Sequence, residues 1–363
     1  MKKIIITALI LISIISCNSK KTDNTEVTTD TNAINTNNTE TSNNDEYVED
    51  NNTEEINTDT AEISEVPGWD LEAFNDLKNV KDAESLKSFE EKHGERSLIM
   101  ALQYGDKKMV TELLSYGVNV DQTYVDNDSP LKTASAKGYL ELVKEFIKRG
   151  ANVNFRGEGN IDALHSAVMS TNENSLKIMK ELLDAGAEVD VEYGWEEPFP
   201  ILLDTIGVDE SKCDLEKFKM LAEYGADINY VDSYGYPLID YAVKSGCLDI
   251  VKYLVSKGID PAMKYELKEF YPNVNISLLA STLYNSDTEM AKYLIEQGAD
   301  VNTPIPSEDG YPLLLQAIDN GNTSLVKLLI EKGADTTVVN KEKKTVFDIA
   351  REKGYDDIVA LEK

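Results

Sequence analysis

Residues 310–335 read GYPLLLQAIDNGNTSLVKLLIEKGAD, and this stretch is one complete copy of the unit from which the chain is built. A Gly-Tyr-Pro turn leads into an apolar run, a polar break follows at 319–322, and a second apolar run ends at Lys332 and Gly333. The spacing predicts two helices joined by a tight turn and stopped by glycine. Glycine directly after a helix favours a left-handed cap, because only glycine adopts positive φ without a Cβ clash.

The same unit recurs along the chain. The terminating glycines are separated by 33, 36, 39, 33, 40 and 35 residues and fall at Gly117, Gly150, Gly186, Gly225, Gly258, Gly298 and Gly333. Five of them are followed by nearly the same tail, as in Gly150-Ala151-Asn152-Val153-Asn154. Such a period indicates a solenoid, in which no single unit buries its own apolar face.

Paired helices near a 33-residue period resemble the ankyrin repeat. The family's Thr-Pro-Leu-His tetrad survives only in fragments, of which Asp162-Ala163-Leu164-His165 keeps the histidine. The resemblance implies an all-α, ankyrin-like solenoid of about seven to eight helix-turn-helix repeats with short β-turn or hairpin fingers. It also implies that His165 is a hydrogen-bonded structural residue. The fold by itself says little about function.

The first residues have the features of an export signal. Met1-Lys2-Lys3 precedes an apolar run from Ile4 to Ile15, which is too short for a bilayer that needs roughly 20 apolar residues. Ile14-Ile15-Ser16-Cys17 resembles the bacterial lipobox, which implies a signal peptide at 1–16 and acyl chains such as palmitate on Cys17. An ordinary cleaved signal with a chance cysteine is the alternative.

Residues 17–66 are predicted to be a disordered acidic tether that begins at the lipidated cysteine. Asn, Thr, Asp and Glu dominate this segment. It has too little apolar surface to offset the conformational entropy lost on folding. The ankyrin-like domain is expected over 67–363.

Degenerate helix pairs at both ends of the domain are expected to be caps. The N-terminal cap is placed at 67–95 and the C-terminal cap at 344–363. In the first cap the apolar spacing predicts the inward-facing residues Leu71, Phe74, Leu77, Leu86 and Phe89.

The chain is strongly acidic, with a formal net charge of −30. Loss of Lys2 and Lys3 with the signal leaves −32. The tether, with 13 acids against 2 lysines, accounts for −11, so −21 falls on the folded part. This balance disfavours nucleic acid and anionic lipid and favours a basic protein partner, although solubility alone would also explain it.

Cys213 and Cys247 are expected to be free thiols. They belong to neighbouring repeats, whose spacing is wide for a disulfide that needs Cα atoms within about 7 Å. Cysteines of proteins in oxidising compartments commonly form disulfides, which would favour a bond between them.

The sequence shows no catalytic, cofactor-binding or metal-binding set. The only histidines, His93 and His165, lie some two repeats apart, so a Ser-His-Asp or Cys-His arrangement is implausible. Phosphate-binding glycine loops, HExxH and paired-cysteine motifs are missing. We therefore expect a non-enzymatic protein, and an enzyme with an unrecognised site is the remaining alternative.

The loops between repeats collect aromatic residues together with Asp and Glu. Two of these loops are unusually long, VEYGWEEPF at 191–199 and MKYELKEFYPNVN at 263–275. Exposed Tyr and Trp give binding surfaces a large contact area at low entropic cost. The predicted centre of a partner site consists of Tyr193, Trp195, Tyr234, Tyr236, Tyr265, Phe270 and Tyr271. The alternative is that these rings stack on one another and stiffen the fingers.

The expected function is protein binding on the concave or finger face of the solenoid, displayed at the bacterial cell envelope. An inhibitor or immunity-type protein for a basic secreted toxin or enzyme is the narrower alternative. We expect a monomer without a cofactor, held at the membrane only through its lipid. Asn18 replaces the Asp that some bacteria use for inner-membrane retention, which slightly favours the outer membrane.

Overall fold

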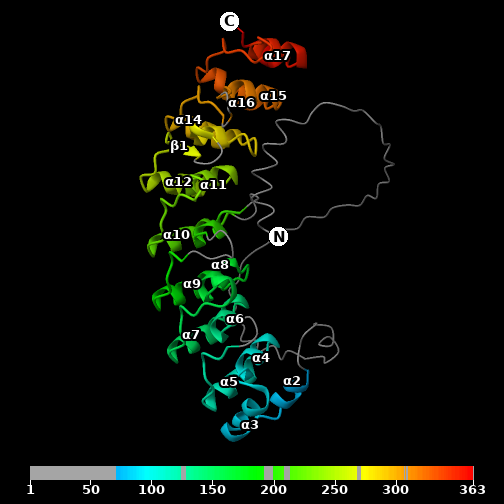
Figure 1. Cartoon of the computed structure of the whole chain (residues 1–363), viewed down its shortest axis with the longest axis vertical. Coiled ribbons are helices and arrows are strands. Elements are labelled where there is room, and N and C mark those ends of the chain that lie inside the picture. The colour runs from blue at the N-terminus through cyan, green and yellow to red at the C-terminus, as the bar shows by residue number, and fades with distance from the viewer. Residues whose placement is uncertain are drawn as a thin grey trace, which may run out of the picture. The chain divides into compact units, whose positions relative to one another are not determined.

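A computed structural model of the chain describes residues 71–123, 128–191, 199–207, 213–267, 271–305, 307 and 310–362. One compact unit begins at Leu71, and Figure 1 shows its helix pairs following one another in chain order. The predicted signal peptide, Cys17 and the tether lie outside the described residues.

The described part of this unit is mainly helical. In chain order its α-helices are α2 (Leu71–Leu77), α3 (Ala83–His93), α4 (Ser97–Gln103), α5 (Lys107–Ser115), α6 (Pro130–Ala136), α7 (Leu140–Lys148), α8 (Ala163–Met169), α9 (Ser175–Asp184), α10 (Leu215–Glu223), α11 (Leu238–Lys244), α12 (Leu248–Ser256), α13 (Leu278–Ser281), α14 (Thr288–Glu296), α15 (Leu313–Asp319), α16 (Thr323–Glu331), α17 (Val346–Lys353) and α18 (Asp356–Val359). The other elements are the 3₁₀ helices η3 (Glu158–Asn160) and η4 (Ile201–Thr205) and the strands β1 (Lys264–Leu267) and β2 (Tyr271–Ser277).

Each regular repeat consists of a short inner helix followed by a longer outer helix. In the repeats built from α6 and α7, α11 and α12, and α15 and α16, these helices have seven and nine residues. Inner helices pack against inner helices, as α6 does against α8, and outer against outer, as α7 does against α9. Because each helix finds apolar partners in the next repeat, the core is continuous, and the predicted all-α solenoid is confirmed.

The outer helices show why the sequence period is helical. In α7 the side chains of Leu142, Val143 and Phe146 are buried, whereas Glu141 and Lys148 are exposed. Each fully buried aliphatic or aromatic side chain stabilises the fold by about 1.5–3 kcal/mol. One repeat supplies only a few such groups, so the stack is stable where the single repeat is not.

The terminating glycines adopt the predicted left-handed conformation. All seven have φ between +84° and +102°. At Gly150, Gly186, Gly258 and Gly333 a Cβ atom would meet nothing within 4 Å, so conformation and not crowding selects glycine there.

At four junctions, hydrogen bonds join the tails of neighbouring fingers, the loops that connect one repeat to the next. The Asn or Asp four residues after one glycine accepts the backbone N–H two residues after the next glycine. These bonds are Asn152 N to Asp121 Oδ1 (3.0 Å), Glu188 N to Asn154 Oδ1 (2.9 Å), Asp227 N to Asp190 Oδ1 (2.8 Å) and Asp335 N to Asn302 Oδ1 (2.8 Å). The recurring tail is therefore a ladder that fixes the fingers relative to one another.

The fourth repeat departs from the pattern. Its inner helix is replaced by η4, a five-residue 3₁₀ helix that lacks a side-chain N-cap. The chain is held again at Asp214, whose backbone N–H donates to Thr205 O at 2.9 Å, just before α10.

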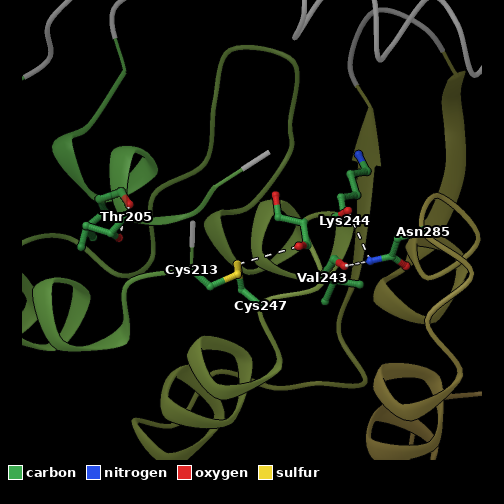
Figure 2. Close-up of a disulfide and its surroundings, with 8 residues drawn as sticks. Thr205, Cys213, Val243, Lys244, Cys247 and Asn285 are labelled. Carbon is green, nitrogen blue, oxygen red and sulfur yellow. Dashed lines mark hydrogen bonds between the residues drawn. A yellow bond between two sulfur atoms is a disulfide. The ribbon is translucent and has the colours of Figure 1, made fainter. Parts of the chain in front are cut away.

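Cys213 and Cys247 form a disulfide, so the expectation of free thiols is wrong (Figure 2). Their Cα atoms are 5.5 Å apart. The expectation assumed the regular spacing of repeats, but Cys213 follows η4 and the insertion after it. It lies just before the N-cap of α10, while Cys247 is itself the N-cap residue of α12. Both cysteines therefore lie at the N-terminal ends of two neighbouring outer helices, α10 and α12.

The long finger after α12 is a hairpin, as the fold class predicted. Strands β1 and β2 pair antiparallel from Lys264 opposite Ser277, with an irregularity between Glu266 and Leu267. Tyr265 and Leu267 are buried while Lys264 and Glu266 are exposed, so one face of β1 packs on the solenoid.

Both ends of the described unit carry helix pairs, α2 with α3 and α17 with α18. In the first pair Phe74, Leu77, Leu86 and Phe89 are buried as predicted. Leu71 is 46% exposed, so its predicted inward orientation is wrong.

Candidate partner-binding surface

The structure describes only part of the predicted aromatic centre. Tyr193, Trp195 and Phe270 lie outside the described residues. Tyr271 is described as the first residue of β2, but its side chain is not. Tyr234, Tyr236 and Tyr265 are described in full.

Asp232 organises the finger that precedes α11. Its Oδ1 accepts the backbone N–H groups of Tyr234 (2.9 Å) and Tyr236 (2.8 Å), and its Oδ2 accepts the Tyr241 hydroxyl at 2.5 Å. Burial, with the negative charge of Asp232 nearby, raises the pKa of Tyr241, so this phenol keeps its proton and remains a donor. Tyr234 at the finger tip is half-buried.

Tyr236 and Tyr265 belong to a buried cluster around Asp240. The Tyr265 hydroxyl donates to Asp240 Oδ1 at 2.7 Å, and Lys244 Nζ lies 2.7 Å from Oδ2 of the same carboxylate. The Lys244 ammonium also lies 3.7 Å from the centre of the Tyr236 ring. Burial is the main cause that raises the pKa of Tyr265 well above its usual value, followed by the Asp240 charge.

This cluster corrects the prediction for two of the seven aromatic residues. Tyr236 is 6% exposed and Tyr265 is 8% exposed, so neither offers a surface to a partner. The alternative that these rings contact one another describes the pair better, although the rings are tilted and not stacked: their centres lie 6.1 Å apart and their planes meet at 59°. They dock β1 onto α11 and stiffen this part of the stack.

Sequence reasoning missed a row of carboxylates that the same fingers present. One acid occupies the second position after the glycine in five consecutive repeats, and all five are exposed: Glu188, Asp227, Asp260, Asp300 and Asp335. The recurring tail of the sequence already places an acid at this position. Glu188 is paired with Arg156, and Asp300 lies 3.6 Å from Lys264 Nζ.

A hollow of about 590 Å³ opens among three successive fingers. Arg156, Glu188, Asp190, Asp227 and Tyr230 contribute to its lining. Acidic groups outnumber the single arginine among these residues, so the hollow has the same charge preference as the row of carboxylates.

Two large apolar side chains are exposed at the ends of inner helices. Met169 ends α8 and is 45% exposed, and Tyr284 follows α13 and is 41% exposed. Lys244 lies 4.9 Å from the Tyr284 ring centre, so this edge of the inner-helix row combines an aromatic surface with a paired cation.

The histidines do not form a catalytic arrangement. His165 is fully buried, and Asp162 Oδ1 lies 2.8 Å from its Nδ1 and accepts its backbone N–H at 3.0 Å, so its predicted hydrogen-bonded structural role is confirmed. His93 contacts Asp76 within the first helix pair, where His93 Nε2 and Asp76 Oδ2 are 2.7 Å apart. Within the described ranges no group of three or more His, Cys, Asp or Glu side chains is placed to hold a metal ion.

The helices of the described segments were also compared with the length and apolarity that a bilayer span requires. None of them is both long and apolar enough to cross a membrane.

The sequence and the fold both match known proteins. Residues 82–193 and 277–361 match the family described as "Ankyrin repeats (3 copies)", and residues 210–255 match "Ankyrin repeats (many copies)". The ankyrin repeat domain of human ASB11 resembles the structure with a TM-score of 0.51 at 23% identity, over 65% of this chain and 99% of that one, which shows the fold alone.

Curated relatives share part of their length with this chain. Ankyrin repeat protein L371 of Acanthamoeba polyphaga mimivirus is 30% identical over 175 residues, which is 48% of this chain and 22% of that protein. An L-asparaginase of Dirofilaria immitis is 29% identical over 178 residues, which is 48% of this chain and 27% of that protein. The chain thus spans about a quarter of the length of these relatives.

Ankyrin repeats generally act as protein–protein interaction modules and are typically not enzymes. Because the three-copy family alone matches more than half of the residues, the chain belongs to the ankyrin repeat family.

Proposed function

We propose that this protein binds a basic protein partner on its finger face, without enzymatic activity, at the bacterial cell envelope. The observation that carries the proposal is the row of five exposed carboxylates, one per repeat, from Glu188 to Asp335. A partner with cations at a matching period would meet opposite charge at every finger. Hydrogen bonds from Thr337 lower the pKa of Asp335, which keeps that end of the row ionised.

Rigidity supports the same proposal. The backbone ladder fixes several of these carboxylates, because the Glu188, Asp227 and Asp335 N–H groups are each held by the preceding finger. A pre-ordered surface loses little conformational entropy on binding, so more of the interaction energy is left for affinity.

The test compares two sets of neutral substitutions in the full-length protein. Glu188→Gln, Asp227→Asn and Asp300→Asn together remove three charges from the finger row. Glu216→Gln, Asp249→Asn and Glu289→Gln remove three charges from the outer helices α10, α12 and α14, where each is the second residue. Both variants lose three negative charges and have the same net charge, so a difference in affinity between them does not come from total charge.

Affinity for the partner recovered from envelope extract should fall at least about tenfold for the finger variant and change little for the outer-helix variant. Association should also weaken steeply with added salt. Equal loss in both variants would mean that only total charge matters and would contradict a finger site.

The aromatic residues that the structure leaves undescribed, together with Tyr234, remain proposed partner contacts. Tyr193, Trp195, Phe270 and Tyr271 belong to the two long loops, where repeat proteins commonly bind partners. Alanine at Trp195 and Tyr271 should reduce partner recovery in a pull-down, and unchanged recovery would remove them from the site.

The envelope location is supported by two independent features. The lipobox-like sequence ending at Cys17 predicts lipid attachment, and the Cys213–Cys247 disulfide fits an oxidising compartment. Expressed in a bacterium, the protein should partition into detergent and carry acyl chains on its N-terminal peptide. Cys17→Ala should abolish both, and a wild-type protein that stays unacylated in the aqueous phase would contradict the anchor.

The narrower alternative, an inhibitor or immunity-type protein for a basic toxin or enzyme, is favoured by the acidity of the folded part. It predicts one dominant cationic partner whose activity is lost in the complex. A set of unrelated partners would favour a general binding module instead.

A further inference from the structure

The Cys213–Cys247 disulfide crosses the least regular place in the described solenoid. It connects the residue before the N-cap of α10 to the N-cap of α12, and so bonds the fourth repeat to the fifth (Figure 2). We propose that this disulfide is a reducible cross-link that couples the two halves of the solenoid across the fourth repeat.

The fourth repeat is the least regular of the repeats, and a covalent cross-link there would stabilise it. Its inner element is the 3₁₀ helix η4, whose hydrogen-bond geometry is poorer than that of an α-helix. η4 contacts α8 on one side and α10 in its own repeat. Because each repeat of a solenoid touches only its neighbours, a weak repeat divides the stack into two parts that can open separately.

The finger side of the same interface is also less tightly bonded. At the three preceding junctions, and at the junction of the sixth and seventh repeats, a side chain four residues after the glycine accepts the N–H of the next tail. At the junction of the fifth and sixth repeats Ala262 occupies this position and has no side-chain acceptor. Among the described residues, Asn229 and Asp260 occupy these two positions at the interface of the fourth and fifth repeats, and no hydrogen bond joins them. The disulfide thus supplies at one end of the repeat a connection that is missing at the other.

The sulfur atoms are placed for reduction by a dithiol. Cys213 and Cys247 line a hollow of about 320 Å³ together with Leu215, Leu248 and Asp249. Cys213 is half-buried and Cys247 is only 2% exposed, so Cys213 is the more accessible of the two residues.

The exchange reaction follows from this placement. A thiolate of the dithiol attacks Cys213 Sγ and forms a mixed disulfide, while Cys247 leaves as a thiolate that then takes a proton. That thiolate forms at the N-terminus of the nine-residue helix α12, where backbone amides favour negative charge. The second thiol of the reductant attacks the mixed disulfide and releases Cys213. The reductant ends as a disulfide, and the protein gains two electrons and two protons as two thiols.

The experiment is native-state hydrogen exchange of the full-length protein, oxidised and after treatment with dithiothreitol. Reduction should speed exchange at least about tenfold in residues 199–207 and in α10. Exchange in α6 and α7, and in α15 and α16, should stay within about twofold, since these helices lie away from the bond. Reoxidation should restore the original rates.

The variant with Cys213→Ser and Cys247→Ser controls for other effects of the reductant, because it retains Cys17. It should exchange like the reduced protein and should not respond to dithiothreitol. Unchanged rates in 199–207 and α10 after verified reduction, or an equal increase along the whole stack, would overturn the proposal. Should the double variant fail to fold, the reduced wild type decides alone.

Discussion

The Asp240 side chain has no exposed surface, so its oxygen atoms depend on partners within the protein. Three side chains from three elements surround it: Lys244 of α11, Tyr265 of β1 and Ser281 of α13. A buried carboxylate destabilises the fold unless donors and a cation compensate for its lost hydration. Tyr265 is therefore a structural donor that holds the hairpin, and this explains why an aromatic finger residue is unavailable to a partner.

Replacing Tyr265 by Phe should destabilise the protein by about 1–3 kcal/mol at neutral pH. The substitution removes the hydroxyl donor, while its acceptor, the Asp240 carboxyl group, stays buried. Urea denaturation measures this difference. Tyr311→Phe is the matched control: its hydroxyl donates to Asp319 Oδ2 at 2.9 Å, but Asp319 is exposed, so the loss should stay below about 1 kcal/mol. Equal losses would contradict the special role of Asp240.

The stability of the wild type and that of Tyr265→Phe should respond differently to alkaline pH. Burial raises the pKa of Tyr265, so the folded state keeps the phenol proton that an unfolded chain loses near pH 10. Its stabilisation is therefore complete below about pH 10 and is lost as the pH rises further. The stability gap between wild type and Tyr265→Phe should shrink between about pH 9 and pH 11. A constant gap would mean that the phenol is not the titrating group.

Gly235 tests how closely the finger and the hairpin approach. Its φ is +99°, and an added Cβ would lie 2.3 Å from Glu266 O. Gly258 has nearly the same φ, +98°, but a Cβ there would meet nothing within 4 Å. Gly258→Ala should cost about 1–2 kcal/mol from backbone conformation alone. Gly235→Ala should cost at least about 1 kcal/mol more, because the hairpin backbone must move. Thermal denaturation of both variants measures the difference.

At the scale of elements, the repeats are connected by side chains that cap helices across the interface. Lys217 of α10 is 7% exposed, and its Nζ donates to Val168 O at 2.8 Å and Ser170 O at 2.7 Å at the end of α8. These carbonyls have no partner within their own helix, so the lysine satisfies groups that every helix end leaves open. Lys353 does the same for Ile318 O and Asp319 O.

Lys217→Met should therefore destabilise the protein by about 1–3 kcal/mol, although methionine preserves most of the side-chain volume. Lys219→Met in the same helix is the control, since Lys219 pairs with Glu216 near the surface at 3.2 Å and such pairs contribute at most about 1 kcal/mol. Chemical denaturation distinguishes them. Two equal, small effects would show that the buried ammonium contributes nothing beyond its packing.

Much of this element structure could be predicted from the sequence. Apolar spacing and the recurring glycines predicted the helix pairs, because both features act within one repeat. The disulfide could not be predicted, since the two cysteines belong to different repeats and a local pattern does not give the distance between neighbouring outer helices. The burial of Lys217 and its hydrogen bonds could not be predicted either, because its acceptors lie in another repeat and no local sequence pattern indicates a buried lysine.

At the scale of the whole molecule, the repeat period predicts where each finger lies in the sequence. It does not predict which finger side chains are buried by neighbouring repeats. Tyr236 and Tyr265 occupy finger positions and were predicted to be contacts, yet the hairpin buries both. The carboxylates at the second position after each glycine remain exposed in five repeats. Alignment of the tails already shows this row, so the acidic part of the candidate site could be predicted from sequence, whereas the burial of Tyr236 and Tyr265 could be seen only in the structure.

The measurement that tests the account most directly is site-specific photo-cross-linking of the full-length protein in intact cells. A photoreactive residue is placed at Asp300 in the finger row or, as the control, at Asp249 on the outer helix α12. We expect covalent capture of a basic protein from Asp300, reduced by added salt, and no comparable capture from Asp249. Capture from Asp249 alone, or equal capture from both positions, would contradict binding on the finger face.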